Sequence, residues 1–154
     1  MSRPTYERDD HLREEEAAID ALQAVWGVVA RKTPKYYKID YAICNAVGVV
    51  VGWVEVRGKT FPRSQYATFY TSLEKYLSVC RFQYATAKPA FLLVKWSDCI
   101  LIYRMSVDDC RRRKITVGGR TVNSRGDDQD IEPVIHIPVA EFKPLNDPSV
   151  VIDV

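Results

Sequence analysis

Two acidic residues and an arginine stand among apolar residues in the stretch YYKIDYAICNAVGVVVGWVEVRGKT, residues 36–60. They are Asp40, Glu55 and Arg57. Successive side chains along a strand point to opposite faces, so Glu55 and Arg57 share one face of a sheet. Asp40 belongs to the preceding strand, and we expect its carboxylate to lie beside them.

Carboxylates that converge at a strand edge repel one another unless a cation lies between them. A hard cation such as Mg²⁺ takes oxygen ligands and keeps several of its waters. Such an ion polarises a phosphodiester and activates a bound water. Asp40 and Glu55 are therefore candidate ligands of Mg²⁺ or Mn²⁺, and the chemistry they predict is phosphodiester hydrolysis.

A third carboxylate is expected from a helix over residues 12–30. Its apolar residues recur at helical spacing and form one buried stripe, which comprises Ala18, Leu22, Val25, Trp26 and Val29. One turn before this stripe lies Glu15, which we expect at the inner edge. Glu14 and Glu16 are expected to point away into solvent.

The remaining elements of the core follow from periodicity and from turn residues. Residues 36–44 and 47–56 predict an antiparallel hairpin with its turn at 45–48. A second helix is expected over 64–87, with Ser64 as its N-cap. Two strands follow, at 90–96 and 100–105, and the first of them is apolar enough to be covered on both faces.

After Met105 the chain predicts further β-structure. We expect a hairpin over 114–122 with Gly118 and Gly119 in its turn, a loop over 124–130 and a last strand over 134–139. The predicted class is α/β, bordering on α+β, with a central mixed sheet flanked by two helices. Residues 1–154 are expected to form one domain, with a core over 12–105 and a β-rich C-terminal extension over 106–154.

This order of elements, with these acids in it, resembles the PD-(D/E)XK nuclease superfamily. Asp40 matches the Asp at the end of one strand of that fold, and Glu55 to Arg57 match the Glu-x-Lys on the next. Glu15 matches the acid that some branches carry on the first helix, and the resemblance implies that it is a further metal ligand. The resemblance covers about residues 12–105, and the chain also looks like small phage-encoded proteins of this type. It implies a restriction-endonuclease-like core and a metal-dependent nuclease.

One position departs from the family pattern. Arg57 stands where the family has Lys, which there positions or deprotonates the attacking water. A guanidinium, with a pKa above about 12, does not act as a base in water, but it can hold a phosphate through two hydrogen bonds. Lys59 has the same strand parity and is the alternative candidate for the lysine's catalytic role.

Nucleic-acid contacts are expected from two places. A run of bases comprises Arg111, Arg112, Arg113 and Lys114 in a chain whose net charge is only +2, and a local basic patch of this kind steers polyanions. A solvated charged loop is the alternative interpretation. Gln65 and Tyr66 lie at the expected start of the second helix, where the helix dipole favours phosphate.

Other features limit the possible classes. The four cysteines form no Cys-x-x-Cys pair, which indicates reduced thiols rather than a zinc or disulfide scaffold. The polar N-terminus lacks the apolar core of a signal peptide, and no apolar run reaches membrane-span length. We therefore expect a cytoplasmic protein, in the host cytoplasm if it is phage-encoded. His11 and His136 are isolated and are expected to be structural or solvated.

Several alternatives remain open from the sequence. Asp40 and Glu55 fit ion pairs with Lys38 and Arg57 on a half-exposed sheet, with no metal. A nuclease fold that has lost catalysis would serve as a nucleic-acid- or protein-binding module, and a virion or assembly component is a further possibility. DNA is favoured over RNA as the partner, no membrane partner is expected, and a homo-oligomer is possible.

Overall fold

The computed structural model describes residues 9–119 and 131–154, and a five-stranded mixed sheet forms its centre. The strands lie in the order β1-β2-β3-β5-β6. Their bounds are Val29–Lys32 for β1, Tyr41–Cys44 for β2, Val50–Gly58 for β3, Ala90–Lys95 for β5 and Ile100–Met105 for β6. The predicted mixed sheet is thus confirmed.

Strand β3 is the central strand, and it carries two of the three charged residues. It runs antiparallel to β2, with Tyr41 opposite Val54, as the hairpin prediction required. It runs parallel to β5, with Glu55 opposite Leu92. Because parallel neighbours need a crossover connection, the chain between β3 and β5 passes over one face of the sheet and returns through helix α2, Leu73–Thr86.

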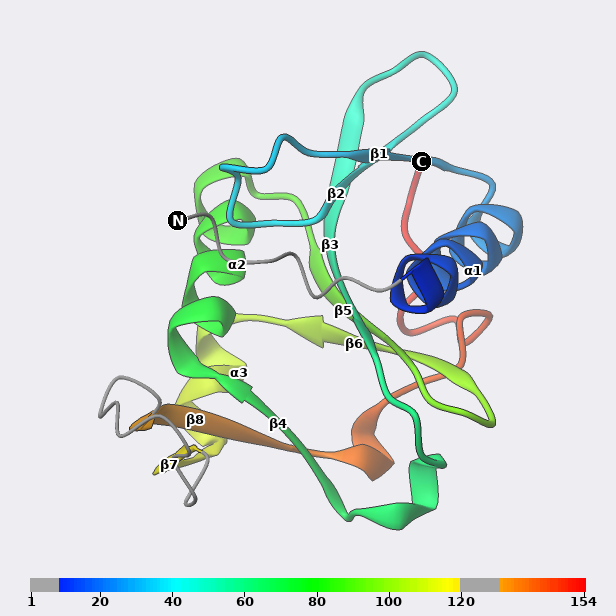
Figure 1. Cartoon of the computed structure of the whole chain (residues 1–154). Coiled ribbons are helices and arrows are strands. Elements are labelled where there is room, and N and C mark those ends of the chain that lie inside the picture. Colours follow the sequence, from blue (N-terminus) through cyan, green and yellow to red (C-terminus); the bar gives the residue numbers. More distant parts are fainter. Residues whose placement is uncertain (1–8, 120–130) are drawn as a thin grey trace, which may run out of the picture.

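The two long helices lie on opposite faces of this sheet (Figure 1). Helix α1, Asp9–Trp26, buries Ala18 and Leu22 against Val54 and Val56. On the other face, Tyr76 of α2 belongs to a second core cluster. The shorter helices are α3 at Val107–Arg112 and the 3₁₀ turns η1 at Arg63–Gln65 and η3 at Val139–Glu141.

A second, three-stranded antiparallel sheet packs on the α2 side. Its order is β4-β8-β7, with bounds Thr68–Ser72 for β4, Ile131–Pro138 for β8 and Lys114–Gly119 for β7. The prediction that Gly118 and Gly119 form a hairpin turn was wrong, because they pair within the sheet with Glu132 and Ile131. Residues 120–122 and the predicted loop at 124–130 lie outside the described residues.

Helix boundaries differ from the predictions for local reasons. Helix α1 ends at Trp26 because Gly27 adopts a φ of +65°, the left-handed conformation that typically ends a helix. After Val28, residues Val29–Lys32 form the edge strand β1, which the sequence did not predict. Helix α2 begins at Leu73 instead of Ser64, because residues 68–72 form strand β4 and pair with β8, with Phe69 buried between exposed Thr68 and Tyr70.

The predicted strand 36–44 is a strand only in its last four residues. Residues 33–40 form a loop instead, since Pro34 opens a turn in which its carbonyl accepts the N–H of Tyr37 at 2.9 Å. The backbone N–H of Thr33 donates to the carbonyl of Asp40, also at 2.9 Å, and closes the base of the loop. Asp40 therefore stands where the loop enters β2.

The segment after η3 returns to the α1 face of the sheet. Leu145, Val150 and Ile152 are buried there with α1. The indole N–H of Trp26 donates to the carbonyl of Leu145 at 2.7 Å. Gly52 of β3 makes room for this segment, because a Cβ at Gly52 would lie 2.6 Å from Ile152 Cδ1.

Within residues 9–119 and 131–154, no helix is long and apolar enough to cross a membrane. All four cysteines are free thiols in the structure, as their spacing predicted. His136 is half-buried in β8, where its ring lies 2.7 Å from the hydroxyl of Thr116. This contact agrees with the structural role expected for His136, whereas the side chain of His11 lies outside the described part.

Candidate active site

Asp40 is fixed against strand β3 by a backbone hydrogen bond. Its Oδ2 accepts the N–H of Val56 at 2.9 Å. The pairing of β2 with β3 ends at Tyr41 and Val54, so the carboxylate takes the place of the next strand partner. A buried N–H without a partner is costly, and this bond therefore orients Asp40 as well as satisfying Val56.

Glu55 is one of the two buried charged residues among those the structure describes, with 6% of its surface exposed. It follows Trp53 on the face of β3 that packs toward α2. Burial raises the pKa of Glu55 to about 7; Arg57 opposes this rise, whereas the neighbouring charge of Asp40 adds to it. A carboxylate held half-neutral near pH 7 binds a cation readily, because the cation stabilises its charged form.

Arg57 lies between these carboxylates. Its guanidinium is 2.7 Å from Glu55 Oε1 and 3.6 Å from Asp40 Oδ2. It also donates to the backbone carbonyl of Val56 at 2.8 Å. Three oxygen atoms, one from the end of the 33–40 loop and two from β3, thus surround one cationic group.

A cavity of about 680 Å³ opens over these residues on the α2 side. Asp40 and Glu55 both contribute to its wall. The other lining residues come from the 33–40 loop, from the start of α2 and from β8, and they are Lys35, Tyr37, Lys38, Ile39, Ser72, Glu74, Lys75, Ser78 and Glu132. The site is therefore open to a ligand of considerable size.

The N-terminus of α2 points into this cavity. Ser72 caps the helix, because its hydroxyl accepts the N–H of Lys75 at 3.4 Å. The helix start that lines this cavity is that of α2, with Ser72 and Lys75, and not the start at Ser64 that was expected to bring Gln65 and Tyr66 there. The free N–H groups and the dipole of a helix start favour a phosphate at this place.

Lys75 is the site residue that the sequence reasoning missed. Its Nζ lies 3.9 Å from Glu55 Oε1, and 61% of its side chain is exposed. The signal was present in the sequence, since Ser72 is a good N-cap and places Lys75 in the first turn of a helix. The predicted N-cap at Ser64 concealed it.

Lys59 lies elsewhere. Its ammonium is 5.0 Å from the ring centroid of Phe69, and it lines a different cavity of about 320 Å³ together with Tyr66. Burial and the nearby charge of Arg57 lower the pKa of Lys59. Gln65 belongs to η1, before β4. The structure therefore does not bring Lys59, Gln65 or Tyr66 together with Asp40 and Glu55.

Glu15 lies on the α1 side of the sheet. Burial raises the pKa of Tyr41, and the charge of Glu15 adds to this rise, so the two residues are close. In the part of the chain that the structure describes, no three acidic, His or Cys side chains are grouped to hold a metal ion. The role of Glu15 as a third ligand stays a prediction. Glu14 differs from its expected position, because its Oε2 would lie 3.2 Å from a Cβ at Gly58.

The basic run is divided between surface and interior. Only 10% of the Arg113 side chain is exposed, and its guanidinium pairs with buried Asp109 at 3.0 Å and with Glu141. Burial acts to raise the pKa of Asp109, but hydrogen bonds from Tyr103, Tyr76 and Arg113 lower it overall. Arg113 thus differs from the expected surface residue, because Asp109 four positions earlier binds it.

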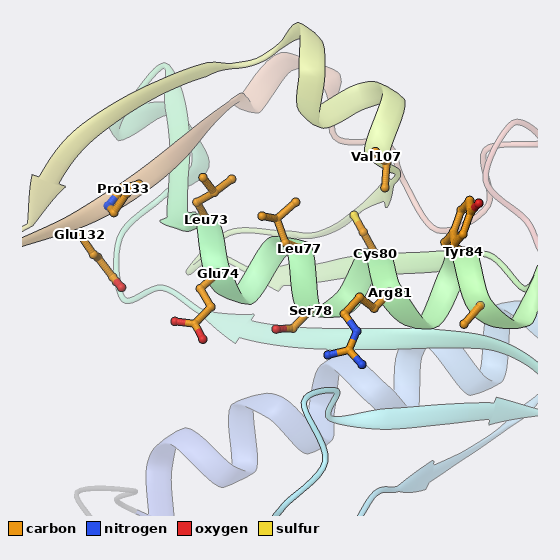
Figure 2. A pocket seen from close by; sticks show the side chains of 11 residues that line it. Leu73, Glu74, Leu77, Ser78, Cys80, Arg81, Tyr84, Val107, Glu132 and Pro133 are labelled. Atoms are coloured by element: carbon orange, nitrogen blue, oxygen red, sulfur yellow. The ribbon is translucent and has the colours of Figure 1, made fainter.

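Arg111, Arg112 and Lys114 remain accessible. The side chains of Arg111 and Arg112 are 76% and 72% exposed, and Lys114 is exposed at the start of β7. They lie beyond the apolar side of α2, where Leu73, Leu77 and Tyr84 line a groove of about 740 Å³ with Val107. Figure 2 shows this apolar side of α2 and, on the helix's other side, Glu74, Ser78 and Arg81.

Comparison with known proteins now adds to this geometry. Residues 1–145 match the model of a family described as "Phage putative PDDEXK endonuclease". Among solved structures, the chain is similar to Hjc, a Holliday junction resolvase from Archaeoglobus fulgidus. The TM-score is 0.53 and the identity 12%, over 87% of this chain and 88% of that one. This likeness shows a shared fold, and a comparison with curated protein sequences finds no match.

Proposed function

Since the chain belongs to this phage PDDEXK endonuclease family, we propose that it is a metal-dependent nuclease that hydrolyses phosphodiester bonds in DNA. One observation supports the proposal above all. Oxygens of Asp40, Glu55 and Val56 surround a single cationic group at the wall of an open cavity. An arrangement that binds a cation and faces solvent is what a metal-dependent nuclease requires.

The donor set fits a hard divalent cation. Asp40 and Glu55 supply carboxylate oxygens, and the Val56 carbonyl is a further oxygen donor in contact with the same guanidinium. Mg²⁺ is commonly held by one or two protein carboxylates with water and substrate completing its shell. A bound Mg²⁺ or Mn²⁺ would polarise the scissile phosphodiester and lower the pKa of water. Glu15 is the third ligand that we propose.

Two cationic side chains, Arg57 and Lys75, are assigned to bind the phosphate and to stabilise charge. Arg57 offsets the charge of the two carboxylates and can bind a phosphate through two parallel hydrogen bonds. It does not accept a proton at neutral pH. Lys75 carries its ammonium to within 3.9 Å of Glu55 from the start of α2. We assign to Lys75 the binding of a non-bridging phosphate oxygen and the stabilisation of charge that develops there.

DNA is the proposed substrate. Lys35, Lys38 and Lys75 line the cavity beside the carboxylates, and lysines in such positions bind the phosphate backbone. One structural neighbour is a Holliday junction resolvase. Branched DNA is therefore the first substrate to examine, together with single strands and linear duplexes.

The proposal is tested by incubating the purified protein with these three DNA forms and with RNA in Mg²⁺, Mn²⁺ or chelator. We expect cleavage of DNA that chelator abolishes and that Glu55→Gln removes. Glu132→Gln is a matched control, because Glu132 lines the same cavity without an ion pair to Arg57. Cleavage that survives Glu55→Gln would refute the assignment of the site. Light scattering of the same sample tests for a homo-oligomer.

A second candidate function is supported by Arg57 itself. Its guanidinium pairs with both carboxylates, and the ammonium of Lys75 lies 3.9 Å from Glu55, so two cations balance the two carboxylates without a metal. A nucleic-acid-binding module would use the same cavity without cleaving. Binding of DNA in chelator, with no Mn²⁺ bound at equilibrium and no product, would select this function.

A further inference from the structure

Two tyrosines of the 33–40 loop are unusually exposed for aromatic residues beside a candidate active site. Tyr36 is 81% exposed and Tyr37 is 44% exposed. Lys35 and Lys38 flank them in the sequence. Exposed aromatic rings interleaved with cations are typical of surfaces that bind single-stranded nucleic acid.

The loop holds these rings in defined positions. Thr33 and Asp40 close its base through the backbone, and the Pro34–Tyr37 turn shapes its tip. Ile39 is 2% exposed and anchors the loop in the core beneath α2. The tyrosines therefore lose little conformational freedom when a ligand binds, so the entropic cost of binding is small.

A row of aromatic rings connects the exposed tyrosine to the interior. The ring centroids of Tyr36 and Tyr37 are 5.3 Å apart, and those of Tyr37 and Phe82 are 6.2 Å apart. Phe82 in turn lies 4.9 Å from Trp53 on β3. Tyr36 is thus the outermost member of a supported row whose inner end rests on the strand that carries Glu55.

A cavity of about 430 Å³ lies between this row and α2. The charged residues that line it are Lys38 and Arg81, both cations. Apolar and aromatic surface comes from Tyr36, Tyr37 and Phe82. Tyr37, Lys38 and Ser78 also line the cavity of the candidate active site, so the two cavities are adjacent.

We propose that this cavity binds one unpaired nucleobase of the substrate, stacked on Tyr36, while the adjoining phosphate lies at the Asp40 and Glu55 site. The inference rests on the proposed nuclease function and specifies the substrate as DNA with an unpaired base next to the cut. Every base presents a π-face, so stacking on Tyr36 favours DNA with an unpaired base, whatever the sequence.

The chemistry of the cavity favours a nucleobase over other partners. A base is flat and apolar on its faces, as the tyrosine surface requires, and it is attached to a phosphate that Lys38 and Arg81 attract. The loop ends at Asp40 itself. A nucleotide placed on Tyr36 is therefore held in register with the carboxylates.

The test measures binding in chelator, where no cleavage occurs. The probes are a single-stranded oligodeoxynucleotide of about 12 nucleotides, the same strand with abasic positions, and a blunt duplex. We expect Tyr36→Ala to weaken binding of the single strand by about 5- to 100-fold. Binding of the abasic strand and the duplex should change less than twofold, and Tyr36→Phe should restore binding.

Tyr84→Ala is the matched control, because Tyr84 is also 81% exposed but lies in the groove on the other side of α2 (Figure 2). The inference is overturned if Tyr36→Ala and Tyr84→Ala behave alike, or if Tyr36→Ala weakens duplex binding equally. Cleavage by the unaltered protein in Mn²⁺ is assayed separately. Cleavage without base stacking refutes this inference alone, and base stacking without cleavage refutes the nuclease function alone.

Discussion

The carboxylate of Asp40 accepts the backbone N–H of Val56 at 2.9 Å, so one side chain both completes strand β3 and faces the candidate active site. Val56 is fully buried, and no water can replace this partner. The two functions of Asp40 can be separated, because an amide keeps the acceptor oxygen while it removes the charge.

We therefore predict different outcomes for two substitutions of Asp40. Asp40→Asn should keep the thermal stability in chelator within about 1 kcal/mol and abolish Mn²⁺ binding. Asp40→Ala should also lose about 1–3 kcal/mol of stability, because the N–H of Val56 loses its partner. Calorimetric unfolding and Mn²⁺ titration measure both effects. Equal stabilities of the two variants would contradict this account.

A second prediction concerns pH. The folded-state pKa of Glu55 is raised from 4.5 to about 7, so the fold favours the neutral carboxyl. Its contribution to stability is complete below pH 4.5 and is lost as the pH rises through about 7. In chelator, Glu55→Gln should therefore be more stable than the unaltered protein at pH 8, by about 1–3 kcal/mol.

Metal binding should show the opposite dependence on pH. Mn²⁺ requires the charged carboxylate of Glu55, so its affinity should rise between about pH 5 and pH 7 by up to tenfold per unit and then level off. Isothermal titration calorimetry at several pH values measures this affinity for Mn²⁺. An affinity that is flat from pH 5 to pH 8 would show that Glu55 is not a ligand.

A third prediction separates the two functions of Arg57. Arg57→Ala removes the cation that competes for Asp40 and Glu55, so Mn²⁺ should bind more tightly, while cleavage falls because a phosphate contact is lost. Arg57→Lys should preserve or raise cleavage, because an amine can accept a proton once its pKa is lowered. If Arg57→Ala changes neither affinity nor rate, the match to Glu-x-Lys is coincidental.

The two lysines should behave differently. Lys75→Ala should lower the turnover number by about tenfold or more, because Lys75 lies 3.9 Å from Glu55. Lys59→Ala should leave turnover unchanged and cost about 0.5–1 kcal/mol of stability through its contact with Phe69. Steady-state kinetics with unfolding curves for both variants test this. The reverse order of effects would restore Lys59 as the catalytic lysine.

Substitutions within the basic run, residues 111–114, should also have different effects. Arg113→Ala removes one of the two arginines that pair with the buried carboxylate of Asp109, Arg112 being the other, and should cost about 1–3 kcal/mol. Arg111→Ala should cost less than about 0.5 kcal/mol of stability. It should also reduce the slope of the logarithm of the DNA-binding constant against the logarithm of salt concentration by about one. Unfolding in denaturant and binding at several salt concentrations measure these effects. A stable Arg113→Ala protein would argue against the structural role.

What the sequence predicted best was local. Alternation along a strand placed Glu55 and Arg57 on one face, and the hairpin brought Asp40 to the same guanidinium. These relationships involve neighbours in the chain. The position of Lys75 depends on the crossover that returns α2 over β3, and strand periodicity contains no information about that path.

Some misses had signals in the sequence. Gly27 marks the end of α1, and the residues after it form β1. Asp109 and Arg113 are four residues apart, the spacing of a helical ion pair, which indicated that Arg113 was engaged. Residues 68–72 were ambiguous, because a strand of five residues is too short to outweigh an adjoining helical pattern.

The hydrogen bond between Trp26 and Leu145 also limits when this part of the fold can form during translation. These residues are 119 positions apart, and the α1 face of the sheet closes only when the later one is present. At about 5–20 residues per second, translation needs roughly 6–24 s to cover that distance. During this interval the nascent chain leaves Trp26 without its partner, and the α1 face of the sheet lacks the cover of Leu145, Val150 and Ile152.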